Sequence, residues 1–376
     1  MFERIRQMLV KEFIQVFRDP RMRTVIFVMP CVQTLVIGYA VTLDVSHVRT
    51  AIYDLDQSVD SRELVSRLVG SGYFDVVEHV DNDRRARELL DRGRVTAVVR
   101  LDHGFAEDLR AGRTAPVQVI VDGTDSNTAG IVLGYVSRIT GAASQEVLAE
   151  RLRRQTGVRR EPGLVELRSR AWFNENLQSR WFFVPGVIAI VVSLATLLLT
   201  SMAVVREKEI GTMEQILVSP ITPTEFILGK TVPFAVIGFI DVTAVTVVGV
   251  FWFEVPIRGN LLLLFGATGL YLMTTLGIGL YISTISQTQQ QAMMSTFFFF
   301  FPAMLLSGFA FPIENMPQVV QWLTYVNPLA YFLVIIRGIF LKGVGADVLW
   351  PQISVLGVMG VAILTLVSRR FHKTLS

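Results

Sequence analysis

Residues 229–231, Gly-Lys-Thr, are the residue types that end a phosphate-binding loop, so nucleotide binding is the first chemistry to consider. Such a loop has the pattern G-x-x-x-x-G-K-[ST] and follows a strand, because consecutive backbone N–H groups must wrap the phosphates. The pattern requires glycine at position 224, which is Thr224, and the segment precedes an apolar run. The sequence therefore excludes nucleotide binding by this motif, and we expect any ATP chemistry to come from a partner.

Other residue types that do chemistry are sparse. The single cysteine, Cys31, lies inside an apolar run and can form no disulfide within the chain, so we interpret it as a lipid- or helix-facing residue. Three histidines are widely separated and predict no metal site: His47, His79 and His103. The sequence contains no nucleophile elbow, no H-E-x-x-H motif and no paired-carboxylate signature. We therefore expect no catalytic residues and no bound metal.

Four aspartates leave one alternative open. Asp54 and Asp56 end a predicted strand, and together with Asp122 and Asp125 they could bind a cation. Aspartates also end strands and cap helices, because a short carboxylate accepts hydrogen bonds from nearby backbone N–H groups. We favour this structural role for all four.

Two capping boxes lie close together between two long apolar runs. Thr212-Met213-Glu214-Gln215 predicts a short helix that ends near Ser219, because Pro220 stops it. Thr222-Pro223-Thr224-Glu225 predicts a second helix with proline in its first turn. This second helix continues to about Phe253, a length of roughly 46 Å at the usual helical rise, which exceeds the hydrocarbon layer.

The short helix between the two boxes is amphipathic. Its apolar residues lie on one side: Ile210, Met213, Ile216 and Leu217. An isolated helix of this length is unstable in water, so the apolar side needs a surface to cover it. Lipid, the rest of the chain and a partner protein are all open at this point, and a tight turn lying on its own bundle is the plainest alternative.

The composition identifies the solvent in which these helices fold. The chain has 376 residues, of which 51% are hydrophobic and only 18% charged, whereas a soluble domain carries about 25% charged residues. An integral membrane protein is indicated. The net charge of +3 is small, and the basic residues flank apolar runs as membrane topology requires, so we exclude nucleic acid as a partner.

Six apolar runs are long enough to cross a membrane, which takes about 20 residues. They are residues 24–42, 183–205, 223–253 (apolar from Thr231), 261–285, 292–311 and 351–368. Residues 312–345 are also largely apolar, but Pro317 and Asn327-Pro328 divide them into short pieces. We interpret these pieces as external re-entrant helices, with a seventh span as the alternative.

Basic residues at both ends set the orientation. They are Arg4, Arg6, Lys11, Arg18, Arg21 and Arg23 before the first span, and Arg369, Arg370 and Lys373 in the tail, residues 369–376. Lysine and arginine accumulate on the cytoplasmic side, so both termini are expected there. This orientation places residues 206–222 in the cytoplasm and residues 43–180 outside.

Residues 1–23 predict an amphipathic helix lying in the membrane interface. Its apolar face contains Phe2, Ile5, Leu9, Phe13, Val16 and Phe17. A cleaved signal peptide is the alternative, because Gly38-Tyr39-Ala40 fits a cleavage site. The segment before the apolar run is long for a signal peptide, which favours an uncleaved anchor.

Residues 43–180 have a different pattern, with dense charge and periodic apolar residues. Strands are predicted at 48–53, 74–78, 94–100 and 116–121, and helices at 58–69, 82–91, 104–110 and 126–155, with Ser58 as a cap. Alternating strands and helices indicate an α/β domain. The predicted fold class is therefore a polytopic α-helical membrane protein of six spans with an inserted extracytoplasmic α/β domain.

The segment REKEIGTMEQILVSPITPTEFILGK, residues 206–230, resembles the cytoplasmic loop of ABC-2 type permeases, the membrane halves of ATP-driven exporters. The resemblance extends to the segments STISQTQQQ at 283–291, FFFFF at 297–301, LSGF at 306–309 and YVNPL at 325–329. It covers the whole chain, including the large domain after the first span, as in the subgroup with a large periplasmic domain.

The resemblance implies a bacterial inner-membrane permease that works as a homo- or heterodimer with an ABC ATPase, which binds ATP and Mg²⁺. This chain is then a transport subunit and not an enzyme, and a periplasmic adaptor is a further partner left open. The coupling residues implied by the motif are Glu207, Glu209, Gly211, Thr212, Met213, Glu214, Leu217, Pro220 and Pro223. Those of the external re-entrant helices are Glu314, Asn327, Pro328 and Arg337.

Polar and aromatic residues inside the spans are candidates for the export path of a drug-like or lipid-like amphiphile. They are Asp241, Phe297, Phe301 and Ser307. Asp241 lies mid-span, where a carboxylate must face protein or water, so a path or proton site and a hydrogen-bonded helix contact are both open. We also expect Glu314 and Arg337 to pair, and Gly266, Gly269, Gly277 and Gly279 to allow close helix packing.

Two other classes of function compete with the exporter. An ion-coupled secondary transporter needs charges inside the membrane, and Asp241 is the only acidic residue at mid-depth. A membrane-anchored receptor or scaffold would use the external domain, and needs neither a doubly capped cytoplasmic helix nor a re-entrant segment. Both features therefore favour the exporter.

Overall fold

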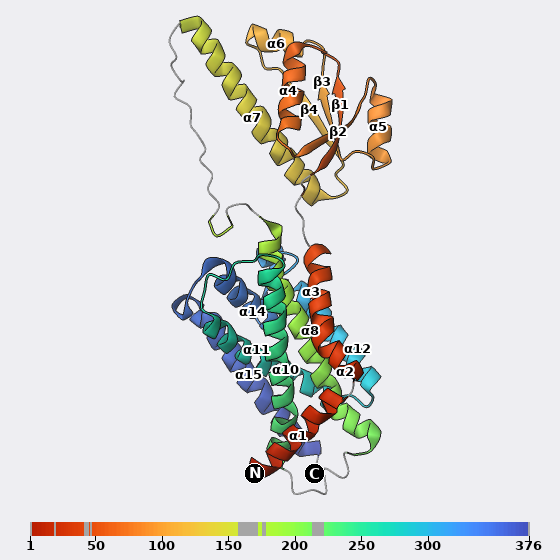
Figure 1. The fold of residues 1–376 in the computed structure, drawn as a ribbon, viewed down its shortest axis with the longest axis vertical. Helices are drawn as coiled ribbons and strands as arrows, with labels where there is room; N and C mark the ends of the chain where they lie inside the picture. Colours follow the sequence, from red (N-terminus) through yellow and green to blue (C-terminus); the bar gives the residue numbers. More distant parts are fainter. Residues whose placement is uncertain are drawn as a thin grey trace. The chain divides into compact units, whose positions relative to one another are not determined.

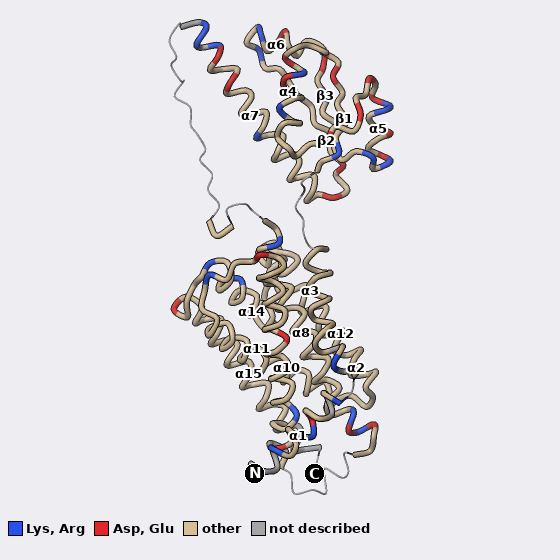
Figure 2. The backbone as a smooth tube through the Cα atoms, viewed as in Figure 1, with Lys and Arg blue, Asp and Glu red and all other residues tan. Residues whose placement is uncertain are grey.

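The computed structural model describes residues 2–18, 20–40, 45, 47–156, 172–174, 178–212 and 222–374. The chain divides into two compact units, one formed by residues 1–42 with 170–376 and the other by residues 43–169 (Figure 1). The first unit is helical and the second contains a β-sheet. Figure 2 shows that lysine, arginine, aspartate and glutamate are dense in the second unit and sparse along the helices of the first.

The helical unit begins with α1 (Phe2–Arg18), α2 (Pro20–Arg23), the π-helical segment η1 (Thr24–Val28) and α3 (Met29–Ala40). It continues with α8 (Ser179–Ile210), α10 (Pro223–Phe251), α11 (Leu261–Ile285) and α12 (Gln289–Leu305). The last part contains η2 (Ile313–Asn315), α13 (Gln318–Thr324), α14 (Pro328–Arg337), the π-helical segment η3 (Gly338–Lys342) and α15 (Ala346–Thr374).

Four helices in the described part of the chain are long and apolar enough to cross a membrane: α8, α10, α11 and α15. A fifth candidate is the pair formed by α13 and Pro328–Lys342, which is bent by 78°. The first predicted span contains a shorter apolar helix, Ile26–Ala40, and α12 has 17 residues. The unit is therefore a helical membrane protein with four or five apolar helices of full length.

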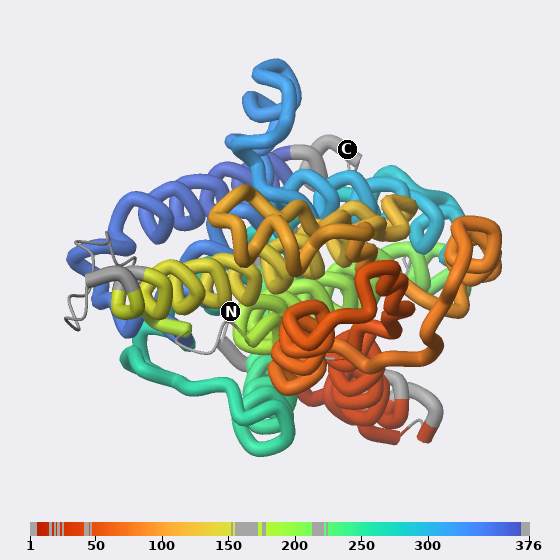
Figure 3. Tube along the Cα trace, turned by 90° about the horizontal axis from the view of Figure 1, so that it is seen from above, coloured from red at the N-terminus to blue at the C-terminus, as the bar shows by residue number. Residues whose placement is uncertain are grey.

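Helix α12 ends earlier than the sequence predicted. We expected residues 292–311 to be helical, but the helix stops at Leu305, and Gly308 adopts φ +80° in the turn that follows. Pro302 in the last turn and a left-handed glycine both interrupt a helix, which explains the early end. The segment with η2 and α13 then projects from the bundle (Figure 3), and Trp322 and Tyr325 are exposed.

Helix α8 is the centre of the helical unit. It packs against α3, α10, α11, α12 and α14. The run from Val184 to Val192 is almost fully buried, as expected for a helix that is apolar on all sides and surrounded by others. Gly279 of α11 allows a close approach, because a β-carbon there would lie 2.8 Å from Thr200 Cβ of α8.

The second unit contains four strands, β1 (Val48–Asp54), β2 (Phe74–His79), β3 (Ala97–Leu101) and β4 (Val117–Val121), and four helices, α4 (Val59–Gly70), α5 (Asp83–Asp91), α6 (Phe105–Ala111) and α7 (Ser126–Thr156). The sheet order is β2-β1-β3-β4, with β4 antiparallel to β3 and the other pairs parallel. Elements begin and end within a few residues of the predicted positions, and Ser58 caps α4 as predicted.

The sheet of this unit is covered on both faces, because successive residues of β3 are apolar and point to opposite faces. Val99 packs in a cluster with Leu68 of α4 and Val132 of α7, whereas Val98 packs in a cluster with Leu89 of α5 on the opposite face. Successive side chains of a strand point to opposite faces, so one apolar strand fills two cores.

The four aspartates act as turn and cap residues. Asp54 accepts hydrogen bonds from the backbone N–H of Asp56 and Gln57, while Asp56 accepts from the N–H of Gly104 and Ala106 at the start of α6. The Ser58 hydroxyl and these N–H groups hold the pKa of Asp56 below its usual value. Asp122 and Asp125 accept from the residues that follow them: Thr124, Asn127 and Thr128. The favoured structural role is confirmed.

Candidate functional site

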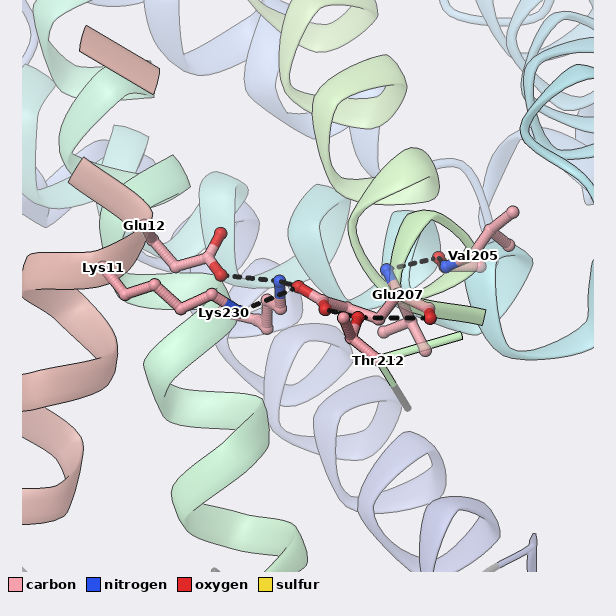
Figure 4. Close-up of polar contacts among 8 residues, drawn as sticks. Lys11, Glu12, Val205, Glu207, Thr212 and Lys230 are labelled. Atoms are coloured by element: carbon pink, nitrogen blue, oxygen red, sulfur yellow. Dashed lines mark hydrogen bonds and ion pairs between the residues drawn. The ribbon is translucent and has the colours of Figure 1, made fainter. Parts of the chain in front are cut away.

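A group of charged side chains, buried at its centre, joins three helices in the helical unit (Figure 4). The Nζ atom of Lys230 lies 2.6 Å from Glu12 Oε1 and 2.8 Å from Glu207 Oε1. Lys11 Nζ lies 3.2 Å from the same oxygen of Glu207, and the Thr212 hydroxyl donates to the other oxygen. We call Lys11, Glu12, Glu207, Thr212 and Lys230 the junction cluster.

The centre of the junction cluster is buried, whereas the Lys11 side chain at its edge is 51% exposed. Lys230 is 2% exposed, and Glu12 and Glu207 are each 4% exposed. An isolated buried charge is very costly, whereas one that is paired and hydrogen-bonded can persist. Removing one partner therefore leaves a neighbouring charge uncompensated, so α1, α8 and α10 are held together by groups that depend on one another.

Each residue of the Gly-Lys-Thr segment has a structural role in α10 or in its contact with α1. A β-carbon at Gly229 would lie 2.9 Å from Met8 Cβ, so glycine allows α1 to approach α10 closely. Lys230 carries the central charge of the junction cluster, and the Thr231 hydroxyl donates to the carbonyl of Ile227 within α10. Local sequence places them there: the capping box of Thr222 and Glu225 starts α10, with Pro223 in its first turn, as predicted.

The end of α8 directs Thr212 toward Glu207. Gly211 adopts the left-handed conformation at φ +79°, which ends the helix, and its N–H bonds to the carbonyls of Glu207 and Lys208. The Thr212 N–H then reaches the Glu207 carbonyl at 3.0 Å. A glycine-terminated helix of this kind turns the chain sharply, so α8 ends within the junction cluster at Thr212.

The same helix end is attached on its other side to the corner between α11 and α12. Lys208 Nζ donates to the carbonyls of Thr284 and Ser286 at 2.8 and 3.3 Å, at the C-terminal end of α11. Glu209 accepts from the backbone N–H of Gln289 at 2.8 Å, at the N-terminal end of α12. Both placements suit the helix dipole, with a cation at a C-terminus and an anion at an N-terminus.

The predicted coupling residues are only partly described. Glu207, Glu209, Gly211 and Thr212 all lie at this helix end, and Pro223 starts α10. Met213, Glu214, Leu217 and Pro220, with most of the predicted short helix, lie outside the described residues. Within the described part, the Thr212 hydroxyl is directed at Glu207 and its carbonyl.

Sequence reasoning missed Lys11, Glu12 and Lys230 as members of a site. One signal was present, because a lysine directly before the apolar stretch of a spanning helix needs a carboxylate partner or a path to water. Lys230 is two turns after the cap of α10, too deep for the cap region. The pairing itself joins positions that are 218 residues apart, which no local pattern reveals.

Asp241 is buried in the middle of α10. It is 1% exposed, and its Oδ2 atom makes no hydrogen bond with any residue that the structure describes. The predicted hydrogen-bonded helix contact of Asp241 is therefore not made by its Oδ2 atom.

Phe297 and Phe301 of α12 stack on each other, with ring centroids 5.9 Å apart, and Phe301 is half exposed.

The expected pair between Glu314 and Arg337 is wrong. Arg337 donates instead to the carbonyl of Gly308 at 3.1 Å and lies 3.8 Å above the ring of Phe182, and no ion pair joins it to Glu314 among the described residues. Gly308 belongs to the turn after α12, so Arg337 attaches this turn to α14. Ser307 also serves this turn, since its hydroxyl donates to Met304 and accepts from the Phe309 N–H.

Asn327 fastens the start of α14. Its Oδ1 accepts from the Leu329 N–H at 3.1 Å and its Nδ2 donates to the carbonyl of Ala303 at 2.6 Å, with Pro328 in the first turn. The motif Asn-Pro therefore caps one helix and attaches it to α12 at once.

Comparison with known proteins agrees with this architecture. The family model described as ABC-2 family transporter protein matches residues 22–369. The probable multidrug ABC transporter permease YbhR of Escherichia coli K12 is 34% identical over 374 residues, covering 98% of this chain and 100% of YbhR. The permease YbhS of the same organism is 36% identical and covers 91% of this chain and 89% of YbhS.

Two further relatives extend the pattern. The inner membrane transport permease YhhJ of Escherichia coli K12 is 34% identical, with 86% of this chain and 85% of YhhJ covered. The ABC transporter G family member 20 of Dictyostelium discoideum is 21% identical, with 89% of this chain and 46% of that protein covered. With relatives that match almost their full length and a family model spanning most of its residues, this chain belongs to the ABC-2 family of transporter proteins as a membrane permease of an ABC transporter.

Proposed function

We propose that the permease crosses the bacterial inner membrane six times, with both termini in the cytoplasm and the α/β unit on the extracytoplasmic side. The apolar segment with α3 and the helix α12 provide the two spans beyond α8, α10, α11 and α15, and α13 with α14 forms an external re-entrant pair. The basic residues at both ends of the chain support this orientation.

The functional assembly proposed here is a dimer of permease subunits with an ABC ATPase on each. ATP and Mg²⁺ bind to the ATPase, and this chain supplies the path for a drug-like or lipid-like amphiphile. Relatives named as multidrug permeases support this substrate class. A periplasmic adaptor that meets the α/β unit is a further partner in this proposal.

Coupling to the ATPase is proposed to pass through residues 206–222. The observation that carries this proposal is the position of the junction cluster, since Glu207 contacts α1 and α10 while its neighbours Lys208 and Glu209 contact α11 and α12. A movement applied to the segment after Thr212 acts first on Glu207. From there it reaches both faces of the bundle through short polar contacts.

The experiment separates coupling from assembly. Thr212→Val removes the hydroxyl that bonds to the carboxylate and the carbonyl of Glu207 while leaving both ion pairs of Glu207. Thr243→Val removes a hydroxyl that bonds only within α10. In vesicles containing the permease and its ATPase, we expect Thr212→Val to hydrolyse ATP and export less substrate per ATP, with Thr243→Val unchanged. An unchanged ratio in both variants contradicts the coupling role, and export driven by an ion gradient without the ATPase contradicts the whole assignment.

A further inference from the structure

A cavity of about 380 Å³ lies among η1, α3, α8, α10 and α12. Its wall is mainly apolar and includes Ile26, Met29, Leu194, Leu198, Phe234 and Met293. The volume falls in the range of about 300–1,000 Å³ that small-molecule sites occupy. Along α8 the lining extends from Leu194 to Arg206, which at the helical rise is about 18 Å. The cavity is therefore elongated enough for a ligand with a long apolar body.

One end of the cavity is polar. Arg206, Lys230 and Glu12 line it, and Lys230 and Glu12 belong to the junction cluster (Figure 4). The two lysines of that cluster, Lys11 and Lys230, balance its two glutamates, so the cluster adds no net charge. Any uncompensated charge at this end must come from another residue.

Arg206 supplies that charge. Arg206 lines the cavity and is half-buried, and its guanidinium forms no hydrogen bond or ion pair with any residue in the described part of the chain. Gln33, on the α3 wall of the same cavity, also has a side-chain amide without a partner among the described residues. A guanidinium beside apolar walls is stabilised by an anion, because its planar donors match carboxylate, sulfate and phosphate oxygens.

We propose that this cavity binds an amphiphile with one anionic head group, with the head on Arg206 and the apolar body along α8 toward Leu194. Arg206 is then the residue that selects for head-group charge, since a cationic head at this position would meet an unbalanced positive charge. The inference rests on the proposed export function and narrows its substrate class.

Two sources offer the same chemistry, a membrane lipid with an anionic head group and a free single-chain amphiphile. Both present an anionic head and an apolar body to the same wall. Because the ligand class is shared, the test first measures the preference for charge and then separates the sources.

The probes are radiolabelled dodecyl phosphate and dodecyltrimethylammonium, which share a chain and differ in head-group charge. Binding to the full-length permease is measured in phosphatidylcholine nanodiscs, with empty nanodiscs of the same composition subtracted. The wild-type chain should prefer dodecyl phosphate. Arg206→Gln should weaken dodecyl phosphate binding about tenfold or more, the usual scale of a lost charge-assisted hydrogen bond, and should not weaken dodecyltrimethylammonium binding.

Three variants serve as controls. Arg206→Lys keeps the charge and should retain most of the preference. Arg369→Gln removes an exposed arginine of α15 that does not line the cavity, and should bind like wild type. Ala195→Phe fills the cavity from α8 and should weaken both probes. Each variant is compared only as a monodisperse preparation with wild-type thermal stability, so misfolding is not read as lost binding.

Specific outcomes overturn the proposal: equal wild-type binding of the two probes, wild-type binding of dodecyl phosphate by Arg206→Gln, or an equal loss in Arg369→Gln. Adding phosphatidylglycerol then separates the sources, because competition identifies a membrane lipid and unchanged binding identifies a free amphiphile; either result supports an anionic ligand. No ATPase or ATP is present, so a failure here leaves the export function intact, and failed export leaves the binding result intact.

Discussion

At the scale of single residues, the helical unit buries charged side chains where three of its helices meet. Lys230 has two carboxylate neighbours within hydrogen-bonding distance and almost no access to solvent. Paired buried charges of this kind contribute little net stability, but breaking them is costly because the remaining partner cannot be solvated. The junction cluster therefore favours the one arrangement of α1, α8 and α10 in which all its charges are paired.

The first prediction concerns Lys230. Lys230→Met leaves Glu12 and Glu207 close together without their shared cation, and we expect a loss of about 3–5 kcal/mol in the free energy of unfolding. The triple variant Lys230→Met, Glu12→Gln, Glu207→Gln removes the three buried charges together and leaves only the exposed Lys11 without its partner, so it should recover a large part of that loss. Thermal unfolding of the detergent-solubilised chain measures both. A single variant as stable as wild type would show that the cluster is solvated in the protein.

At the scale of elements, the sequence predicts features that depend on neighbouring residues better than contacts between distant ones. The start of α10 depends on Thr222, Pro223 and Glu225, which are neighbours in the chain, and the sequence predicted it. The end of α12 depends on a left-handed glycine at 308, which the apolar pattern does not register. The partner of Arg337 is a backbone carbonyl exposed by that same turn, so the missed turn led to the wrong ion pair.

Contacts between helices were predicted in part, because small residues indicate that a helix packs closely but not which helix it packs against. Gly277 and Gly279 both lie against neighbouring helices, as expected, whereas a β-carbon at Gly266 would meet no atom within 4 Å. The glycine pattern thus indicated the right helix, and only the three-dimensional arrangement shows which positions are tight.

The second prediction uses this difference within α11. Gly279→Ala places a β-carbon 2.8 Å from Thr200 Cβ and 3.2 Å from the Leu197 carbonyl, both parts of α8 that cannot rotate away. We expect overpacking to cost about 1–3 kcal/mol. Gly266→Ala in the same helix has open space and should be neutral or slightly stabilising. Unfolding temperatures of the two variants in one detergent measure the difference, and equal values would mean that α8 and α11 can separate freely.

At the scale of the whole molecule, the chain joins an apolar helical unit suited to a membrane and an α/β unit suited to water. The helical unit buries apolar residues between its helices, whereas the α/β unit has a charged surface and two apolar cores on either side of one sheet. Composition alone predicted this division, because the density of charge changes abruptly near residue 43. The proposed side of the membrane for each unit rests on the basic residues at the termini, and cysteine labelling can measure it.

The third prediction tests that step. The single native cysteine is removed as Cys31→Ser, and one new cysteine is placed at Arg84, exposed on α5, or at Gln287, exposed between α11 and α12. In right-side-out vesicles a membrane-impermeant maleimide should label Arg84→Cys and spare Gln287→Cys, because the α/β unit is proposed to lie outside and the α11–α12 corner beside the coupling segment. Inverted vesicles should give the reverse. Labelling of both cysteines from one side would place the α/β unit and the junction cluster in the same compartment, and would contradict six spans with an extracytoplasmic insertion.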